Sequence, residues 1–234
     1  MRAPLLHLTY IMIKKIEITF NQNENDQPLC WEFDYTSTKS INLQSEQASP
    51  LNWLKLETHK CNNCSLSKTD YPFCPAARAI NSYAAEIINK RSIDKATVKI
   101  WESSGRYLEY KDKDLQDIVG ELVRIAVFQS ACPIGRRARK IIDFIPPFPT
   151  KNEVIHAFSL FFAVQKLNNK ERDERKDADF LNILNDLFTK LSHRVQELAQ
   201  GDAGINGVLI YHSLTMLMSL SLTRQLENKL KSFD

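Results

Sequence analysis

Three cysteines and a histidine crowd into one short stretch of the chain, and their side chains are of the kind that bind soft metal ions. The stretch reads His59-Lys-Cys61-Asn-Asn-Cys64 and is followed, after nine residues, by Cys74. Two residues between the thiols of Cys61 and Cys64 allow one tight turn to direct both sulfurs at a single point. A tetrahedral ion then needs two further ligands, which His59 and Cys74 supply locally. Thiolates favour a zinc ion or an iron–sulfur cluster, and the sequence leaves both open.

A fourth thiol, Cys132, lies far along the chain and is an alternative to His59 as the last ligand. It precedes Pro133 at the expected end of a long helix, just as Cys74 precedes Pro75. A proline often follows a ligand cysteine in iron–sulfur proteins. The metal site predicted from the sequence therefore draws on both His59 and Cys132 as candidates for its last position.

Other interpretations of the cysteines are weaker. Cys61 and Cys64 lack the strand-then-helix context of a thioredoxin-like redox pair, and incidental small residues in a surface loop are the plainest alternative. Cys30 lies on the polar face of an expected strand and is interpreted as a spare thiol. Five cysteines, an odd number, without a convincing export signal argue against a disulfide framework and favour a reducing, cytoplasmic location.

The cysteine blocks resemble those of an uncharacterised family of bacterial proteins, whose members carry H-x-C-x-x-C-P-L, C-P-x-A and G-C-P in this order over a similar length. Here the blocks occupy residues 59–66, 74–77 and 131–133, with Ser65 in place of the proline and Ala131 in place of the glycine. The resemblance covers nearly the whole chain. It implies one ligand set made of Cys61, Cys64, Cys74 and Cys132, with His59 nearby. It implies no activity, because the family has none assigned.

The elements that position these residues follow from hydrophobic periodicity. Two alternating runs, Ile13–Phe20 and Leu29–Tyr35, predict one β-hairpin. A second hairpin is predicted from Ala96–Trp101 and Arg106–Tyr110, which flank a turn with a glycine. The cysteine loop lies between the two hairpins, and a helix is expected to follow it from Pro75, because proline is favoured in the first turn.

The second half of the chain is expected to be helical. One apolar helix is predicted from Asp112 or Asp114 to Cys132, where Pro133 ends it. Further helices are predicted at 152–167, 177–200 and 205–231. The expected fold class is α+β, with two N-terminal β-hairpins flanking a cysteine-rich metal loop and a C-terminal helical region. We interpret residues 1–12 as a disordered or mis-annotated extension, 13–150 as an α+β metal-binding region, and 151–234 as a helical region packed on it as one domain.

Composition and motifs narrow the class of function. The chain has 31 basic and 28 acidic residues, a balance too even to indicate a nucleic-acid partner. No apolar run reaches the ~18–20 residues of a membrane span, so no membrane partner is expected. No glycine-rich phosphate loop, paired-histidine motif or G-x-S-x-G elbow is present, so no catalytic residue is assigned and enzymatic activity stays open.

The sequence thus predicts a metal-binding protein of unknown cellular role, in which the site is structural or senses redox or metal state. The alternative is an iron–sulfur protein that transfers electrons or supports a reaction. A homodimer through the C-terminal helices is the one partner that the helical pattern suggests.

Overall fold

The computed structural model describes residues 13–20, 28–34, 52–84, 87, 90–168, 174–198 and 206. The chain divides into two compact units. One consists of Met1–Ser40 and Asp94–Asp114, and the other of Ile41–Ile93 and Leu115–Asp234. The predicted extension at 1–12 and, apart from residue 206, the predicted helix at 205–231 lie outside the described residues.

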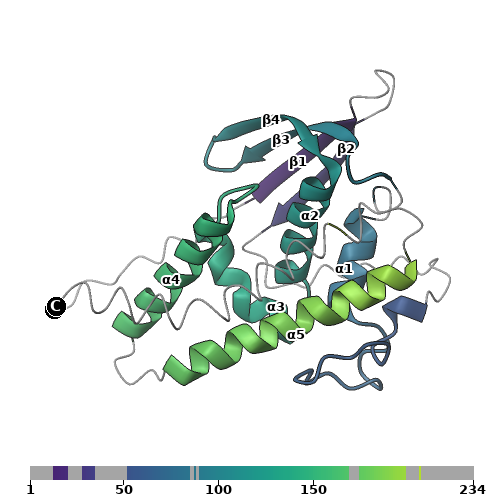
Figure 1. The fold of residues 1–234 in the computed structure, drawn as a ribbon, viewed down its shortest axis with the longest axis vertical. Coiled ribbons are helices and arrows are strands. Elements are labelled where there is room, and N and C mark those ends of the chain that lie inside the picture. The colour runs from purple at the N-terminus through teal and green to yellow at the C-terminus, as the bar shows by residue number, and fades with distance from the viewer. Residues whose placement is uncertain are drawn as a thin grey trace. The chain divides into compact units, whose positions relative to one another are not determined.

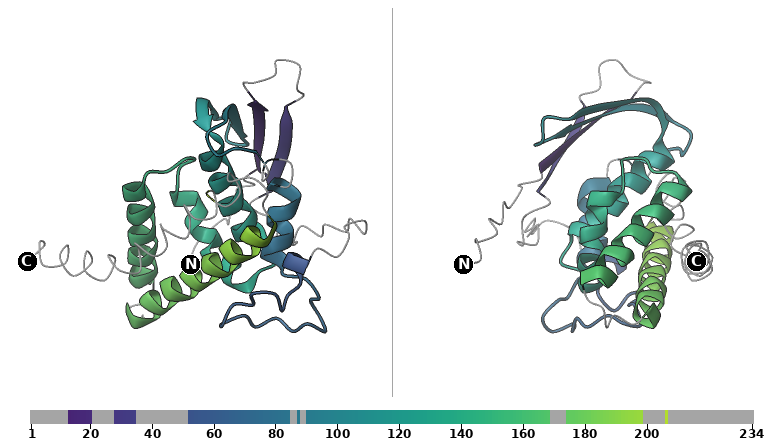
Figure 2. Two further views of the ribbon diagram at one scale, coloured as in Figure 1. Left: turned by 45° about the vertical axis from the view of Figure 1, so that its right-hand side comes forward. Right: turned by 90° about the vertical axis from the view of Figure 1, so that its left-hand side faces the viewer.

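The first unit is a four-stranded antiparallel sheet, which forms one twisted and curved layer (Figure 2). Its strands, in the order β2-β1-β3-β4, are β1 (Ile13–Phe20), β2 (Leu29–Asp34), β3 (Lys95–Glu102) and β4 (Tyr107–Asp114). Both predicted hairpins are confirmed, and β1 joins them by pairing with β3 across a long sequence separation. Alternate residues on the two central strands are buried, as the period of two requires. These are Ile16, Ile18, Val98 and Ile100.

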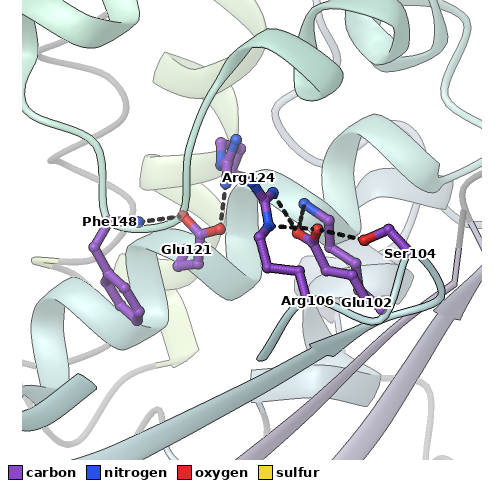
Figure 3. Close-up of polar contacts among 7 residues, drawn as sticks. Glu102, Ser104, Arg106, Glu121, Arg124 and Phe148 are labelled. Atoms are coloured by element: carbon purple, nitrogen blue, oxygen red, sulfur yellow. Dashed lines mark hydrogen bonds and ion pairs between the residues drawn. The ribbon is translucent and has the colours of Figure 1, made fainter. Parts of the chain in front are cut away.

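The turn between β3 and β4 is fastened by Glu102. Gly105, at φ +85°, makes the turn, and its amide donates to the carbonyl of Glu102 at 2.9 Å. The Glu102 carboxylate accepts hydrogen bonds from Arg106 at 2.8 and 2.9 Å (Figure 3) and forms a 3.3 Å ion pair with the buried Lys14. Burial by itself would raise the pKa of Glu102. The hydrogen bonds and charges of Arg106 and Lys14 outweigh it and hold this pKa below its usual range.

β4 is longer than its sequence pattern indicated. Lys113 and Asp114 still pair with β3, although the register shifts between Ala96 and Val98 and Asp112 adopts a positive φ of 53°. The helix expected to begin at Asp112 or Asp114 therefore begins at Leu115. Because the sheet is irregular at this end, Asp112 and Asp114 remain in the strand, although aspartates at such positions often cap a helix.

The second unit is helical and is built around α2 (Figure 1). Its helices are α1 (Pro75–Ala84), α2 (Leu115–Gln129), α3 (Pro133–Ala138), α4 (Lys151–Asn168) and α5 (Glu174–Leu198). Two short 3₁₀ turns, η1 (Asn52–Leu54) and η2 (Arg139–Phe144), complete the described elements. All but two residues of α2 are buried, and it packs against α1, α3 and η2. α5 contacts η1, α1 and α3, so it lies along the elements that carry the cysteines.

A buried ion pair lies inside α2. The guanidinium of Arg124, 1% exposed, donates from Nη2 to Glu121, whose other carboxylate oxygen accepts the amide of Phe148 at 3.4 Å (Figure 3). Among the residues that the structure describes, Nε and Nη1 of Arg124 find no hydrogen-bond partner. The guanidinium therefore lacks some of its hydrogen bonds, and loss of either residue would leave the charge of the other buried and unpaired.

Within the described ranges, no single helix is long and apolar enough to cross a membrane. In the same ranges, α2 and the segment Pro133–Ile141 reach that length and apolar composition when they are counted together, although the chain bends by 98° between them.

Candidate metal centre

The Cys61–Cys64 segment forms the tight turn that its spacing predicts. The amide of Cys64 donates to the carbonyl of Cys61 at 3.1 Å, which closes the turn. The carboxylate of Asp186, on α5, accepts the backbone amide of Asn62 at 2.9 Å and its side-chain amide at 3.5 Å. The two cysteines are thus held on a turn whose exposed tip is tied to a helix far along the chain.

Cys74 is placed by a short pairing of two extended segments. Its amide donates to the carbonyl of Leu54 at 2.8 Å, and the amide of Leu56 donates to Pro72 at 2.9 Å. Pro75 is the first residue of α1, as predicted. Cys74 is therefore buried at the start of a helix, on a backbone fixed by hydrogen bonds on both sides.

Cys132 occupies the same kind of position at the start of α3. Pro133 is the first residue of that helix, and Cys132 is its extended N-cap residue. The amide of Cys132 donates to the hydroxyl of Ser130 at 3.2 Å, and this hydroxyl donates to Val127 at 2.7 Å. The sequence predicted Pro133 only as a helix break. The structure shows that it also begins a helix, which makes the two Cys-Pro pairs equivalent.

Four thiols from three separate segments lie near one another, because the charges of the other three reach Cys61 and those of Cys74 and Cys64 reach Cys132. Burial raises the pKa of Cys61 well above its usual range, and the neighbouring Cys132, Cys74, Asp186 and Cys64 raise it further. Burial raises the pKa of Cys132 to about 12, and Cys74 and Cys64 add to the rise. None of the four is in a disulfide. The set Cys61, Cys64, Cys74 and Cys132, expected from the resemblance, is brought into one region of the second unit.

The thiols do not stand at coordinating distances. Among the residues that the structure describes, no three His, Cys, Asp or Glu side chains converge closely enough to hold a metal ion. The amides of Gly135 and Ile134 act on the sulfur of Cys132 and oppose the rise in its pKa, although no capping hydrogen bond of ordinary geometry forms there. The arrangement is that of neighbouring thiols on fixed backbones, and not of a closed ligand cage.

His59 lies with α5. Its Nε2 is 2.7 Å from the carboxylate of Glu197, and its ring meets that of His193 edge to face with centroids 5.4 Å apart. Of the two candidates for the last ligand, the structure brings Cys132 to the other thiols and pairs His59 elsewhere.

Cys30 is in β2, within the sheet unit, as its strand pattern predicted. It is exposed, and its sulfur lies 3.7 Å from the carboxylate of Glu17 on β1. A position on the sheet surface agrees with its interpretation as a spare thiol.

Sequence reasoning missed the two α5 residues that hold the cysteine loop, Asp186 and Arg194. Arg194 is buried and donates to backbone carbonyls of residues 53–56. One signal was available for Arg194, because it follows Leu187 by seven positions and Leu191 by three and therefore falls on the apolar face of the predicted helix. Asp186 had no such signal, since its partner is 124 positions away.

Comparison with known proteins places the chain in a family. Residues 18–234 match the family described as a domain of unknown function, DUF6901, and the chain belongs to it. No curated protein and no solved structure matches. The prediction of an uncharacterised family is confirmed. That the family is bacterial, and that its members share the cysteine blocks, stay predictions.

Proposed function

We propose that the protein binds one metal centre through the thiolates of Cys61, Cys64, Cys74 and Cys132, and that this centre stabilises the cysteine loop. The observation that carries the proposal is that four free thiols from three segments, two of them buried, lie in one region of the second unit, where the charges of Cys132, Cys74 and Cys64 all reach Cys61. Thiolates repel one another, so such a cluster is unfavourable when ionised unless a cation neutralises it. A metal ion would replace the thiol protons, and its attraction for the thiolates would outweigh their repulsion.

We expect the site to close by rotation of side chains. The backbones of Cys64, Cys74 and Cys132 are each fixed by a hydrogen bond of their own amide. Rotation of a cysteine about χ1 moves its sulfur by roughly 3 Å without moving the backbone. Rotation of this size about χ1 is the movement by which we expect the four sulfurs to converge. A donor set made only of sulfur favours a zinc ion or an iron–sulfur cluster.

The exposure of the loop supports a stabilising role. None of residues 62–72 is buried, so this segment has almost no core of its own. Ligation at Cys61 and Cys64 on one side and at Cys74 on the other would close it into a short ring. Binding energy at such a site adds directly to folding energy, because the unfolded chain has no preformed site.

An iron–sulfur cluster is the second candidate, favoured by one observation. The amides of Gly135 and Ile134 act on the sulfur of Cys132, and amide hydrogen bonds to ligand sulfurs are a common means of tuning a cluster's reduction potential. In that case the same four cysteines would be the ligands, and the protein would transfer electrons or sense redox state.

Elemental analysis with an absorption spectrum, on protein purified without oxygen, tests the proposal and separates the two candidates. About one zinc per chain without colour indicates a structural site, and about four irons with a broad band near ~400 nm indicate a cluster. Cys64→Ser should lower the metal content and the unfolding midpoint together, whereas the control Cys30→Ser should change neither. Wild-type protein with neither metal and with all five thiols free would overturn the proposal.

A further inference from the structure

Arg194 is one of the most deeply buried charged residues in the described part of the second unit. Only 2% of it is exposed, and it lies on the inner face of α5. Its Nη1 donates to the carbonyls of Trp53 and Lys55, the latter at 2.8 Å, and its Nη2 donates to the carbonyl of Leu56 at 3.0 Å. One planar guanidinium thus donates hydrogen bonds to three carbonyls of a single short segment.

These carbonyls lie where a helical turn ends. η1 finishes at Leu54, and the amide of Lys55 donates to the carbonyl of Asn52 at 3.1 Å. Carbonyls at the end of a helical turn lack partners within the turn, and a basic side chain is a common way to satisfy them. Arg194 therefore fixes the path of the chain at the point where η1 gives way to the extended residues that follow.

The segment that Arg194 binds is itself hydrogen-bonded to Cys74. Just after η1, Lys55 forms an isolated antiparallel bridge with Phe73. Hydrogen bonds flank this bridge on both sides and include the one from the amide of Cys74 to Leu54. The segment that Arg194 holds is therefore the same one that holds the third cysteine and both ends of the cysteine loop.

Asp186 provides a second anchor on the same helix. It binds Asn62 in the Cys61–Cys64 turn, and it precedes Arg194 by eight residues, or ~12 Å along a helix axis. The tip of the loop and its base are thus both attached to one rigid element. The distance between Cys74 and the Cys61–Cys64 turn is set by the spacing of these two anchors.

We propose that Arg194 is a positioning residue for the thiol site, which holds Cys74 within reach of the other three cysteines by fixing the carbonyls of Trp53, Lys55 and Leu56. The inference rests on the proposed metal site for its purpose, but the positioning itself exists with or without a metal. α5 then positions the cysteines before any metal binds. It does so although it is far from them in the sequence and supplies none of the proposed ligands.

The test compares Arg194→Met, which keeps the length and loses the donors, with Arg194→Lys, which keeps the charge and loses the planar fork. Lys190→Met, on the same helix one turn earlier, is the matched control. Metal-free protein is treated with dibromobimane, which joins only neighbouring thiols, and the bridged cysteines are identified by mass spectrometry. Bridges from Cys74 to the other thiols should be lost in Arg194→Met and reduced in Arg194→Lys, while the Cys61–Cys64 bridge within the turn persists in both.

Metal binding is then measured on the same variants by competition with a chelator. Zinc affinity should fall by about 10-fold in Arg194→Met and remain at the wild-type value in Lys190→Met. Wild-type protein that binds no metal, with Cys74 bridging still dependent on Arg194, would overturn the proposed function and leave the positioning role standing. Unchanged Cys74 bridging in Arg194→Lys and in folded Arg194→Met would overturn the positioning role. Should Arg194→Met fail to fold, Arg194→Lys decides the outcome.

Discussion

The carbonyl oxygen of Val127 lies so close to Gly135 that a Cβ atom on residue 135 would stand only 2.3 Å from it. Val127 is near the end of α2 and Gly135 is in the first turn of α3. The missing side chain lets the two helices meet backbone to backbone, and Cys132 lies in the short connection between them. The position of this thiol therefore depends on a glycine three residues further on.

Gly135→Ala should displace the start of α3 and, with it, Cys132. Because the obstructing atom belongs to the backbone, relief requires movement of a helix, and we expect a loss of ~1–3 kcal/mol in the free energy of unfolding. Metal content should fall as well. Urea denaturation and elemental analysis measure the two effects.

The matched control is Gly105→Ala, in the sheet unit. No atom stands within 4 Å of its added Cβ, but its φ of +85° makes any side chain strained. This variant should lose ~1–2 kcal/mol at full metal content. A Gly135→Ala protein with the wild-type unfolding midpoint would show that the contact with Val127 is not maintained in solution.

The buried pair of Glu121 and Arg124 should be strongly coupled. Glu121→Leu leaves a buried guanidinium without the carboxylate that pairs with it and should cost ~3–5 kcal/mol. Arg124→Met should cost less, because the Glu121 carboxylate keeps the amide of Phe148. The double variant should be more stable than Glu121→Leu alone. Urea unfolding of all four proteins gives the coupling energy, and additive effects of the two substitutions would contradict a buried pair.

Local features of the fold could be predicted from the sequence, and long-range ones could not. Alternation with period two indicated both hairpins, and proline after cysteine indicated the start of α1. Nothing local indicated that β1 pairs with β3, because the residues that meet, such as Ile16 and Ile100, are far apart in the chain. The start of α2 was predicted too early because Asp112 and Asp114 resemble helix caps, whereas they end β4.

The candidate site divides in the same way. The spacing of Cys61 and Cys64 predicted their turn, since that geometry is local. The same closeness in sequence favoured His59 as a ligand, but its partner in the structure is Glu197, 138 positions away. Cys132 entered the set only through the resemblance and the repeated Cys-Pro pair. Cys132 lies near the other thiols because of how the helices pack, and the spacing of residues along the sequence does not show this packing.

The ion pairs of Glu102 should make the sheet unit sensitive to acid. Its folded pKa lies below the ordinary value of 4.5, so its stabilising contribution is complete above pH ~4.5 and is lost as the pH falls through the folded pKa. Glu102→Gln should therefore lower the urea midpoint at pH 7 and have little effect at the lowest pH at which the fold persists. Glu109→Gln, on an exposed position of β4, is the control and should change neither. If the urea midpoint of Glu102→Gln lies below that of the wild type by the same amount at pH 7 and in acid, the lowered pKa would be contradicted.

The choice between His59 and Cys132 as the last ligand can be decided by a pair of substitutions. His59→Ala removes a partly exposed contact with Glu197, so it should cost only ~0–1 kcal/mol and leave the metal content at the wild-type value. Cys132→Ser removes a buried thiol from the four-cysteine set, so it should abolish stoichiometric metal binding and unfold at a lower midpoint than metal-loaded wild-type protein. Elemental analysis after gel filtration gives the metal content of both variants. If His59→Ala loses the metal and Cys132→Ser retains it, the site comprises three local cysteines and the histidine, and the contact of His59 with Glu197 must break when the metal binds.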